Sequence, residues 1–172
     1  MERSLQQLTS QFPQHGRLDA IFLRPQRREP CIQVSETVAE ADVGLKGDHK
    51  QGGKRQVSLI QAEHLGLIAA FLGRTAIDPI LLRRNLVISG INLISLKPLF
   101  PELILQVRIG EALIEVSGDC EPCSRMEELL GTGGYNAMRG HGGMVARIVE
   151  SGRIRVGDAV SAIVATRQTT LI

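Results

Sequence analysis

Val116-Ser-Gly-Asp-Cys-Glu-Pro-Cys-Ser-Arg-Met126 marks the point where the chain changes from a strand pattern to a helix pattern. An alternating apolar run precedes it, and a helical apolar pattern follows from Met126. A strand-to-helix junction leaves backbone N–H groups unpaired, and the helix dipole favours an anion there. A cysteine in this position is shifted toward the reactive thiolate. The sequence therefore predicts a chemically active junction at Cys120 and Cys123, with Arg125 adding positive charge.

Strand patterns dominate on both sides of this junction. Immediately before it, residues 103–109 and 112–117 predict a hairpin around Gly110-Glu111. Further strands are expected at residues 18–23, 31–38, 57–61, 86–89, 145–149, 153–156 and 159–164. Short helices are expected at residues 62–72, 79–83 and 125–130, with one helical turn inside residues 131–143. Many short strands without regular βαβ alternation predict a mainly β fold with short helices, a closed or partly closed β-barrel.

Length and composition limit the classes of protein to consider. The chain has 172 residues, which predicts one domain over residues 17–172. The polar composition of residues 1–16 predicts a leader there. A net charge of +2, one tyrosine and four phenylalanines argue against nucleic-acid binding. No apolar run suits a signal peptide or a membrane span. Three cysteines argue against a secreted disulfide scaffold, so a reducing, cytoplasmic setting is expected.

The Cys120-Glu-Pro-Cys123 motif has several chemical interpretations. A structural zinc site would need a second ligand pair, and the four histidines show no paired spacing. A thioredoxin-like dithiol also has this local motif, but it lies early in a βαβ unit rather than after a long β-rich segment. One cysteine acting as a catalytic thiolate or a single metal ligand remains open. Two inert buried cysteines are disfavoured by the charged residues around them.

Two other segments have the composition of anion-binding sites. The loop from Gly47 to Lys54-Arg55 is rich in glycine and basic residues, but the lysine lies one position late for a P-loop. Its alternative is a plain basic surface loop. Arg83-Arg84-Asn85 could clamp a phosphate or a fused-ring amide, or could be a solvated helix end. His141 could reach a ligand from its glycine-rich segment. His49 is assigned to the site because it lies in the basic loop, which is itself a candidate for anion binding.

Taken together, the motifs resemble the MOSC domain, named for the C-terminal domain of molybdenum-cofactor sulfurase, in its small stand-alone bacterial form. The matching segments follow one another in family order: residues 44–48, 56–61, 82–90, 109–110, 122–123, 142–143, 146–147 and 157–158. The resemblance spans roughly residues 17–164 and implies a β-barrel-like fold with a pocket for molybdenum cofactor (Mo-molybdopterin). It implies that Cys123 ligates the molybdenum or carries a sulfane sulfur.

The resemblance also suggests the remaining site and the reaction. The residues expected to bind the cofactor are Lys54, Arg55, Arg83, Arg84, Asn85, Arg125, His49, His141 and Gly142. The implied activity is an oxidoreductase that reduces N-hydroxylated compounds and receives electrons from a separate reductase. One alternative is a sulfur carrier that holds a persulfide from a cysteine desulfurase on Cys123, and another is a dithiol redox protein. Compared with some relatives, the chain is expected to be without an N-terminal barrel extension and a C-terminal helical module, and His49 stands where many members have arginine.

Overall fold

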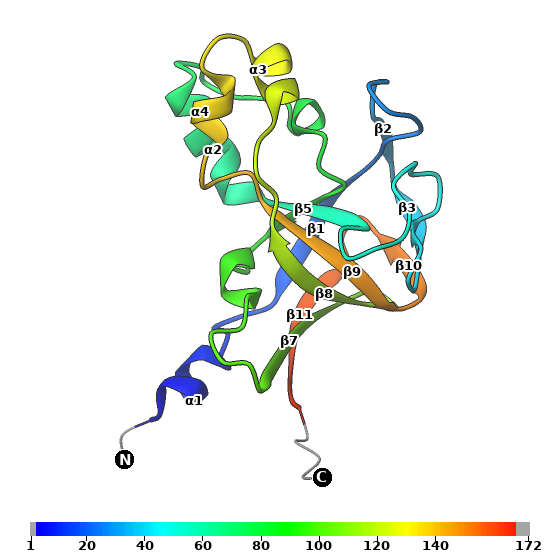
Figure 1. Cartoon of the computed structure of the whole chain (residues 1–172), viewed down its shortest axis with the longest axis vertical. Coiled ribbons are helices and arrows are strands. Elements are labelled where there is room, and N and C mark those ends of the chain that lie inside the picture. Colours follow the sequence, from blue (N-terminus) through cyan, green and yellow to red (C-terminus); the bar gives the residue numbers. More distant parts are fainter. Residues whose placement is uncertain (1–2, 168–172) are drawn as a thin grey trace.

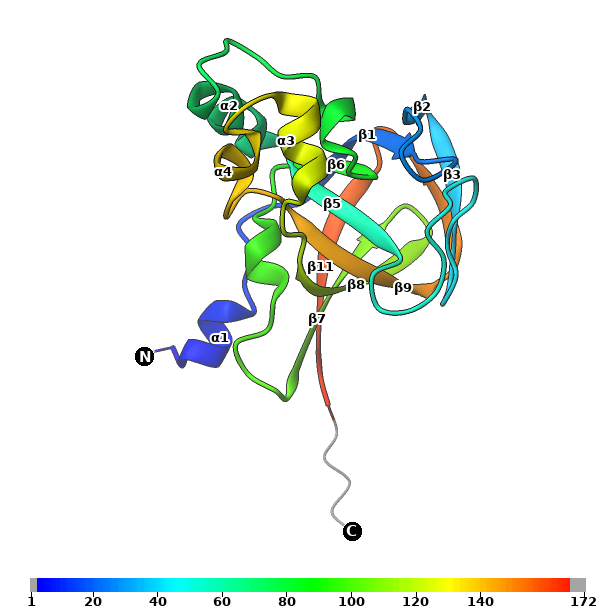
Figure 2. The same ribbon diagram turned by 45° about the horizontal axis from the view of Figure 1, so that its top comes forward.

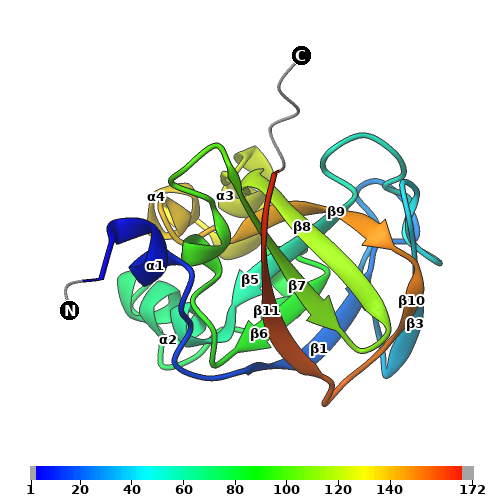
Figure 3. The same cartoon turned by 90° about the horizontal axis from the view of Figure 1, so that it is seen from below.

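Strands from the whole length of the chain close a barrel in the computed structural model, which describes residues 3–167. Around the barrel the order is β1, β11, β7, β8, β9, β5 and β6, and β6 pairs again with β1 (Figure 3). The bounds are β1 Gly16–Leu23, β5 Val57–Gln61, β6 Leu86–Ser89, β7 Leu103–Ile109, β8 Ala112–Asp119, β9 Met144–Glu150 and β11 Ala159–Thr166. The expected mainly β, barrel-like fold is confirmed.

Within residues 3–167, four short strands lie outside the barrel ring. β2 (Ile32–Val34) extends the barrel sheet along β1, whereas β3 (Glu36–Glu40), β4 (Gly44–Leu45) and β10 (Gly152–Arg155) form a separate sheet. The single strand expected over residues 31–38 is therefore wrong. A bend at Ser35 divides it, because one part pairs with β1 and the other with β10.

The helices are short and three of them gather at one end of the barrel. These three are α2 (Ala62–Phe71), α3 (Ser124–Leu130) and α4 (Gly134–Met138), as Figures 1 and 2 show. The others are α1 (Leu5–Thr9) and the 3-10 helices η1 (Pro79–Leu82) and η2 (Leu93–Leu96). The predicted cap of η1 is present, since the Asp78 side chain accepts from the Ile80 N–H at 3.0 Å. Among the described residues, no helix has both the length and the apolar character needed to span a membrane.

The apolar interior consists of two layers that share three strands. One cluster fills the barrel and includes Leu59 and Leu86. The second lies between the outer barrel surface and the helices, and it includes Ile60, Val87 and Met126. Because successive strand residues point to opposite faces, β1, β5 and β6 contribute to both layers. These strands consequently read as nearly continuous apolar runs.

One parallel pair interrupts the otherwise antiparallel barrel. β5 and β6 run in the same direction, and the chain between them passes through α2 and η1. The crossover brings the start of β6 beside the middle of β5, where the Asn85 N–H donates to the Ser58 carbonyl at 3.0 Å. Residues 83–85, which join η1 to β6, are thereby held against the buried part of the sheet.

Candidate functional site

The cysteine motif lies between a strand and a helix, as the sequence predicts. β8 ends at Asp119, α3 begins at Ser124, and Cys123 is the residue that caps the helix, with an extended backbone (φ −132°, ψ 174°). Both motif cysteines are free thiols, but Cys120 is buried and Cys123 is exposed. The Cys120 N–H donates to the Gly143 carbonyl at 2.9 Å. The two thiols therefore have different surroundings, and Cys123 is the one open to large partners.

Arg84 supports this junction from inside the protein. Its guanidinium is almost fully buried, and it donates to the carbonyls of Gly142 at 2.7 Å, Leu82 at 2.8 Å and Cys120 at 3.4 Å. Gly142 allows this arrangement, since a Cβ there would stand 2.1 Å from the Cys120 oxygen. The Arg84 guanidinium makes no ion pair within the described residues. Arg84 and Gly142 thus hold the backbone around Cys120.

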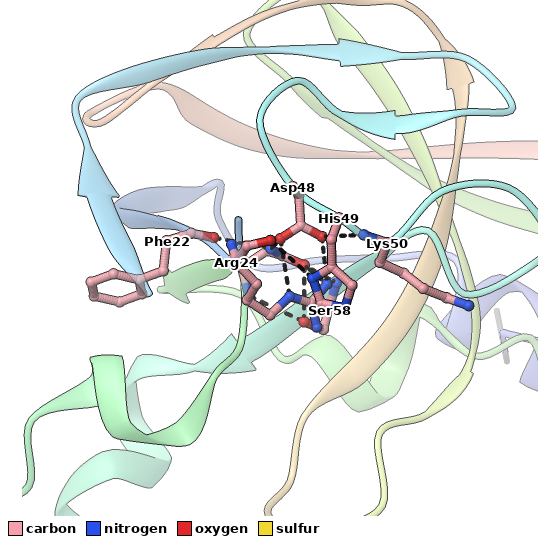
Figure 4. A network of polar contacts seen from close by, with 7 residues as sticks. Phe22, Arg24, Asp48, His49, Lys50 and Ser58 are labelled. Atoms are coloured by element: carbon pink, nitrogen blue, oxygen red, sulfur yellow. Dashed lines mark hydrogen bonds and ion pairs between the residues drawn. The ribbon is translucent and has the colours of Figure 1, made fainter. Parts of the chain in front are cut away.

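Figure 4 shows a polar network that includes Arg24, Asp48 and Ser58. Asn85 makes hydrogen bonds to all three of these residues. Its side chain is inaccessible to solvent. The amide nitrogen donates to the Phe22 carbonyl at 3.0 Å and to Asp48 Oδ1 at 3.1 Å, and Oδ1 accepts from Arg24 at 2.9 Å. Oδ1 also accepts from the backbone N–H and the hydroxyl of Ser58, both at 3.1 Å. Through these hydrogen bonds, the Asn85 amide joins β1, β5 and the glycine-rich basic loop of residues 47–55, which is called the basic loop below.

Arg24 and Asp48 form the charged part of the same network. Arg24 Nε and Nη2 donate to the two carboxylate oxygens of Asp48 at 3.0 and 2.8 Å, a bidentate pair, and the Asp48 side chain is fully buried. Burial raises the pKa of the Asp48 carboxyl, but the hydrogen bonds and charge of Arg24 outweigh it, so the pKa lies below its usual value. Sequence reasoning missed Arg24, whose only signal is its position directly after a buried strand.

His49 is attached to the network through backbone atoms. Its N–H donates to the Arg24 carbonyl at 2.8 Å, and its Nδ1 lies 2.9 Å from the same oxygen. The residue is exposed, as are its neighbours Lys50, Lys54 and Arg55. The Ser117 hydroxyl donates to the Lys54 carbonyl, which places the end of the basic loop beside β8. The loop therefore presents cations close to the strand that leads into the cysteine motif.

Arg83 and Arg125 converge on the loop that joins β1 to β2. Arg83 has a left-handed backbone (φ 56°) and donates to the Glu29 carbonyl. Arg125 donates to the Arg28 carbonyl at 3.2 Å and pairs with Glu128 at 2.7 Å, and its Nε is buried without a partner. This loop consequently links the end of η1 to the start of α3, where Cys123 lies.

Cys31 follows this loop and lies in the electric field of the same arginines. Burial raises the pKa of the Cys31 thiol, while the charges of Arg83 and Arg24 oppose that shift. The third cysteine, isolated in the sequence, thus lies near the predicted clamp residues. It packs partly against the apolar layer beneath the helices.

His141 lies at the end of the barrel where the helices gather, beside α2. Its ring makes an edge contact with His64 of α2, with 5.0 Å between ring centroids, and its Nδ1 is buried without a partner. Burial and the neighbouring His141 hold the pKa of His64 below its usual value, against the opposite effect of Glu63. No hydrogen bond or ion pair within residues 3–167 connects His141 to the other predicted site residues through its side chain.

The arrangement of potential metal ligands within residues 3–167 does not favour a structural zinc site. No group of three or more His, Cys, Asp or Glu side chains within residues 3–167 is arranged to hold a metal ion. A structural zinc ion needs four such ligands. A metal held by one cysteine and by its own organic cofactor remains compatible with this arrangement.

Comparisons with known proteins agree with this geometry. The family model described as MOSC domain matches residues 46–161. YuaD from Bacillus subtilis has a similar fold, with a TM-score of 0.69 and 18% identity over 90% of this chain and 98% of that one. YiiM from Escherichia coli gives a TM-score of 0.63 at 20% identity, covering 90% and 72% of the two chains. YiiM from Geobacillus stearothermophilus gives 0.66 at 19%, covering 86% and 75%. A comparison with curated proteins finds no match.

Proposed function

This chain belongs to the MOSC domain family, and on that premise we propose that it binds molybdenum cofactor with the Cys123 thiolate as a ligand to the metal. Some members of the family bind this cofactor. The observation that carries the proposal is the exposed, free thiol of Cys123 at the junction of β8 and α3. A soft thiolate is a suitable ligand for a metal that the cofactor already holds through sulfur.

The surrounding donors fit an anionic cofactor. Arg125 has a buried Nε without a partner two residues after Cys123, and Arg83 has no carboxylate partner among the described residues. Lys54 and Arg55 are exposed on the loop beside β8. Guanidinium and ammonium groups bind phosphate oxygens through charge-assisted hydrogen bonds. We therefore assign direct contact with the cofactor to Arg83, Arg125, Lys54, Arg55 and the exposed His49.

The buried members of the predicted set have a different role in this proposal. Arg84 and Asn85 already donate to protein carbonyls and to Asp48. They would have to give up these bonds to touch a ligand, which leaves buried polar groups unpaired. Both are therefore positioning residues: Arg84 holds the backbone of Cys120, and Asn85 holds the Arg24–Asp48 pair.

The proposed reaction is the reduction of N-hydroxylated compounds. The bound cofactor would supply two-electron oxygen-transfer chemistry, and a separate reductase would return the electrons. The protein's own contribution is to place the Cys123 sulfur at an accessible point, to orient the cofactor through its phosphate and to fix both groups on rigid elements. Cys123 serves this purpose because it is the exposed residue at which the chain passes from β8 into α3.

A sulfur carrier is the second candidate, and the exposure of Cys123 favours it. A persulfide must be loaded by one protein and delivered to another, so its thiol has to be accessible to large partners. Cys123 is exposed, whereas Cys120 is buried. A dithiol mechanism would require both thiols, and it is the third candidate in the same experiment.

Metal and pterin analysis of the purified protein tests these candidates. A host that makes molybdopterin should yield protein with molybdenum and a pterin chromophore, and a molybdopterin-deficient host should not. Cys123→Ser is expected to abolish molybdenum retention, whereas Cys120→Ser, the matched control, should largely keep it. Equal molybdenum in both variants would reject the ligand assignment. Sulfane sulfur on Cys123 without metal would favour the carrier, and activity that depends on both cysteines would favour the dithiol protein.

The cationic contacts can be tested separately. Arg83→Gln should weaken retention of the pterin by about tenfold, because one charged hydrogen bond to phosphate contributes roughly 1.5 kcal/mol or more. Arg139→Gln removes the same charge from the exposed end of α4 and serves as the control. The measurement is pterin released from equal amounts of each variant after dialysis. The same loss in both variants would show only a general charge effect.

A further inference from the structure

β11 has an open edge where it extends past β1. β1 pairs only with Ala159 and Val160 at the start of β11, whereas β7 pairs with β11 as far as Thr166. Figure 2 shows the end of β11 extending away from the rest of the barrel. Within residues 3–167, no hydrogen bond joins the edge after Val160 to any segment other than β7. Residues 161–166 therefore present an unpaired strand edge.

The backbone groups on this edge follow from the geometry of an antiparallel pair, in which successive residues direct their N–H and C=O groups to opposite sides. The Arg167 N–H donates to the carbonyl of Glu102, directly before β7, at 2.7 Å. Every second residue before Arg167 consequently faces β7 in the same way. Ala162, Val164 and Thr166 lie between those residues, so their N–H and C=O groups point to the open edge.

A groove runs beside this edge. It is lined by the segment before β1 and by Ala162 and Val164, and it measures about 550 Å³ with its open mouth included. Neighbouring strands lie about 4.7–4.9 Å apart, so a strand added to β11 would enter this groove. Phe12, from the segment before β1, packs against the barrel core. That wall is therefore fixed, and the groove exists before anything binds.

The composition of β11 does not protect its edge. Exposed edges are usually short, or carry charged residues, proline or a bulge that prevents pairing with another chain. β11 has eight residues, Ala-Val-Ser-Ala-Ile-Val-Ala-Thr, and its register with β7 continues without a shift. By contrast β2, at the other end of the strand order, has three residues and begins two positions after Pro30. β11 thus resembles a strand that is paired on both sides.

The same composition suits a second copy of this chain as the partner. An antiparallel pair around a twofold axis places equivalent residues opposite one another, so any charge would face a like charge. β11 carries no charge between Ala159 and Thr166. An axis at Val164 sets Val164 against itself and Ala162 against Thr166, which satisfies every outward N–H group of residues 161–166. The edge is therefore complementary to itself.

We propose that two copies of this chain associate through β11, antiparallel and in this register, so that the β7–β11 sheets of both copies become continuous. The pairing supplies backbone hydrogen bonds along the edge and covers part of the Val164 side chain, which is 37% exposed. β-branched residues such as valine and threonine favour this arrangement. The inference does not depend on molybdenum or on Cys123, and it can be tested on protein that contains no cofactor.

Cross-linking tests the register. In a hydrogen-bonded antiparallel pair the opposed Cα atoms lie about 5.5 Å apart, within the range that a disulfide spans. Val164→Cys should therefore form a disulfide between two copies on mild oxidation with diamide, located by peptide mass spectrometry. Ile163→Cys is the matched control, because its two copies would lie on a diagonal about 7–8 Å apart, which is too far. Equal cross-linking of both variants, or none of Val164→Cys, would overturn the proposal.

The mass in solution tests the association itself. Light scattering after size-exclusion chromatography of the full-length protein should give twice the mass of one chain. Val164→Pro removes an N–H group at the open edge of both copies and should weaken association by about tenfold or more, since each hydrogen bond contributes roughly 0.5–1.5 kcal/mol. Val164→Thr keeps the N–H group and should remain a dimer. A monomeric native chain, or equal association of the two variants, would contradict the proposal. If Val164→Pro does not fold, as circular dichroism would show, the cross-linking result decides.

Discussion

The two sides of the barrel differ in how many of their faces are buried. On the side of β5 and β6, the helices cover the outer face, and all five residues of β5 are buried. On the side of β7 and β11, the outer face is open, and β7 alternates strictly between buried and partly buried residues. The polar network, Arg84 and the cysteine junction all touch the covered side. The buried residues of the predicted site, Arg84 and Asn85, thus lie where a second apolar layer fixes the backbone, whereas Cys123 itself is exposed.

The largest expected effect comes from adding one methyl group on the covered side. Gly143→Ala places a Cβ 2.0 Å from the Leu59 carbonyl at a φ of +88°. Gly52→Ala has a similar φ of +70° but meets nothing within 4 Å. Both substitutions lower the free energy of unfolding by about 1–2 kcal/mol, because alanine disfavours the left-handed backbone. Only Gly143→Ala must also displace β5, which lowers it by about 3 kcal/mol or more in addition.

Chemical denaturation measures this difference in the free energy of unfolding. Gly143→Ala should be strongly destabilised or fail to fold, and Gly52→Ala should remain folded with a modest loss. Similar losses in the two variants would show that the covered side can relax, contrary to the comparison.

A smaller effect is expected from removing side-chain volume. Ile60→Ala creates a cavity between β5 and the helices, where Ile60 is fully buried, and should cost about 2–5 kcal/mol. Ile163→Ala makes the same change on the open face of β11, where the side chain is 40% exposed, and should cost less than about 1 kcal/mol. Thermal unfolding of both variants checks the order, and a reversal would mean that the helices contribute little to stability.

The smallest expected effect is a pH dependence that separates a buried ion pair from a surface one. The pKa of Asp48 is lower in the folded protein than its usual value of 3.8. The Asp48–Arg24 pair therefore contributes stability that is present above about pH 4 and is lost as the pH falls through the lowered pKa. Glu36 is paired with Arg155 on the exposed separate sheet, and its pKa is lowered mainly by that hydrogen bond.

Urea denaturation between pH 7 and pH 2 compares the two pairs. Asp48→Asn should reduce the decrease in the free energy of unfolding at acid pH more than Glu36→Gln does. The reason is that solvent screens the surface pair of Glu36. An equal change in both variants would indicate that the buried network contributes no more than a surface contact.

The elements predicted correctly are those with local signals. α2 follows a change of period at Ala62, η1 begins at the Asp78-Pro79 cap, and the β7–β8 hairpin turns at Gly110. η2 had a similar signal that was not used, since the Asn92 side chain accepts from the Ile94 N–H at 3.2 Å. The division of residues 31–38 could not be predicted, because it depends on pairing with β10 near the other end of the chain.

The site shows the same limit. The strand-to-helix position of Cys123 was predictable, since it rests on two adjacent periodic patterns. The inward direction of Arg84 and Asn85 was not, because their partners are Gly142, Asp48 and Phe22, which lie far away in the sequence. The ordered set of motifs therefore identified the family and the neighbourhood of the site without distinguishing exposed residues from buried ones.

The amino-acid sequence by itself determined the barrel class, most element boundaries, the cysteine junction and the family. These properties follow from the spacing of apolar residues, from caps and turns, and from motifs read along a few neighbouring positions. Only the tertiary structure decided that Cys123 is exposed while Cys120 lines a cavity, and that Arg24 joins Asp48 and Asn85. Burial and pairing depend on segments brought together by closing the barrel and covering one side of it with helices, so no local pattern could encode them.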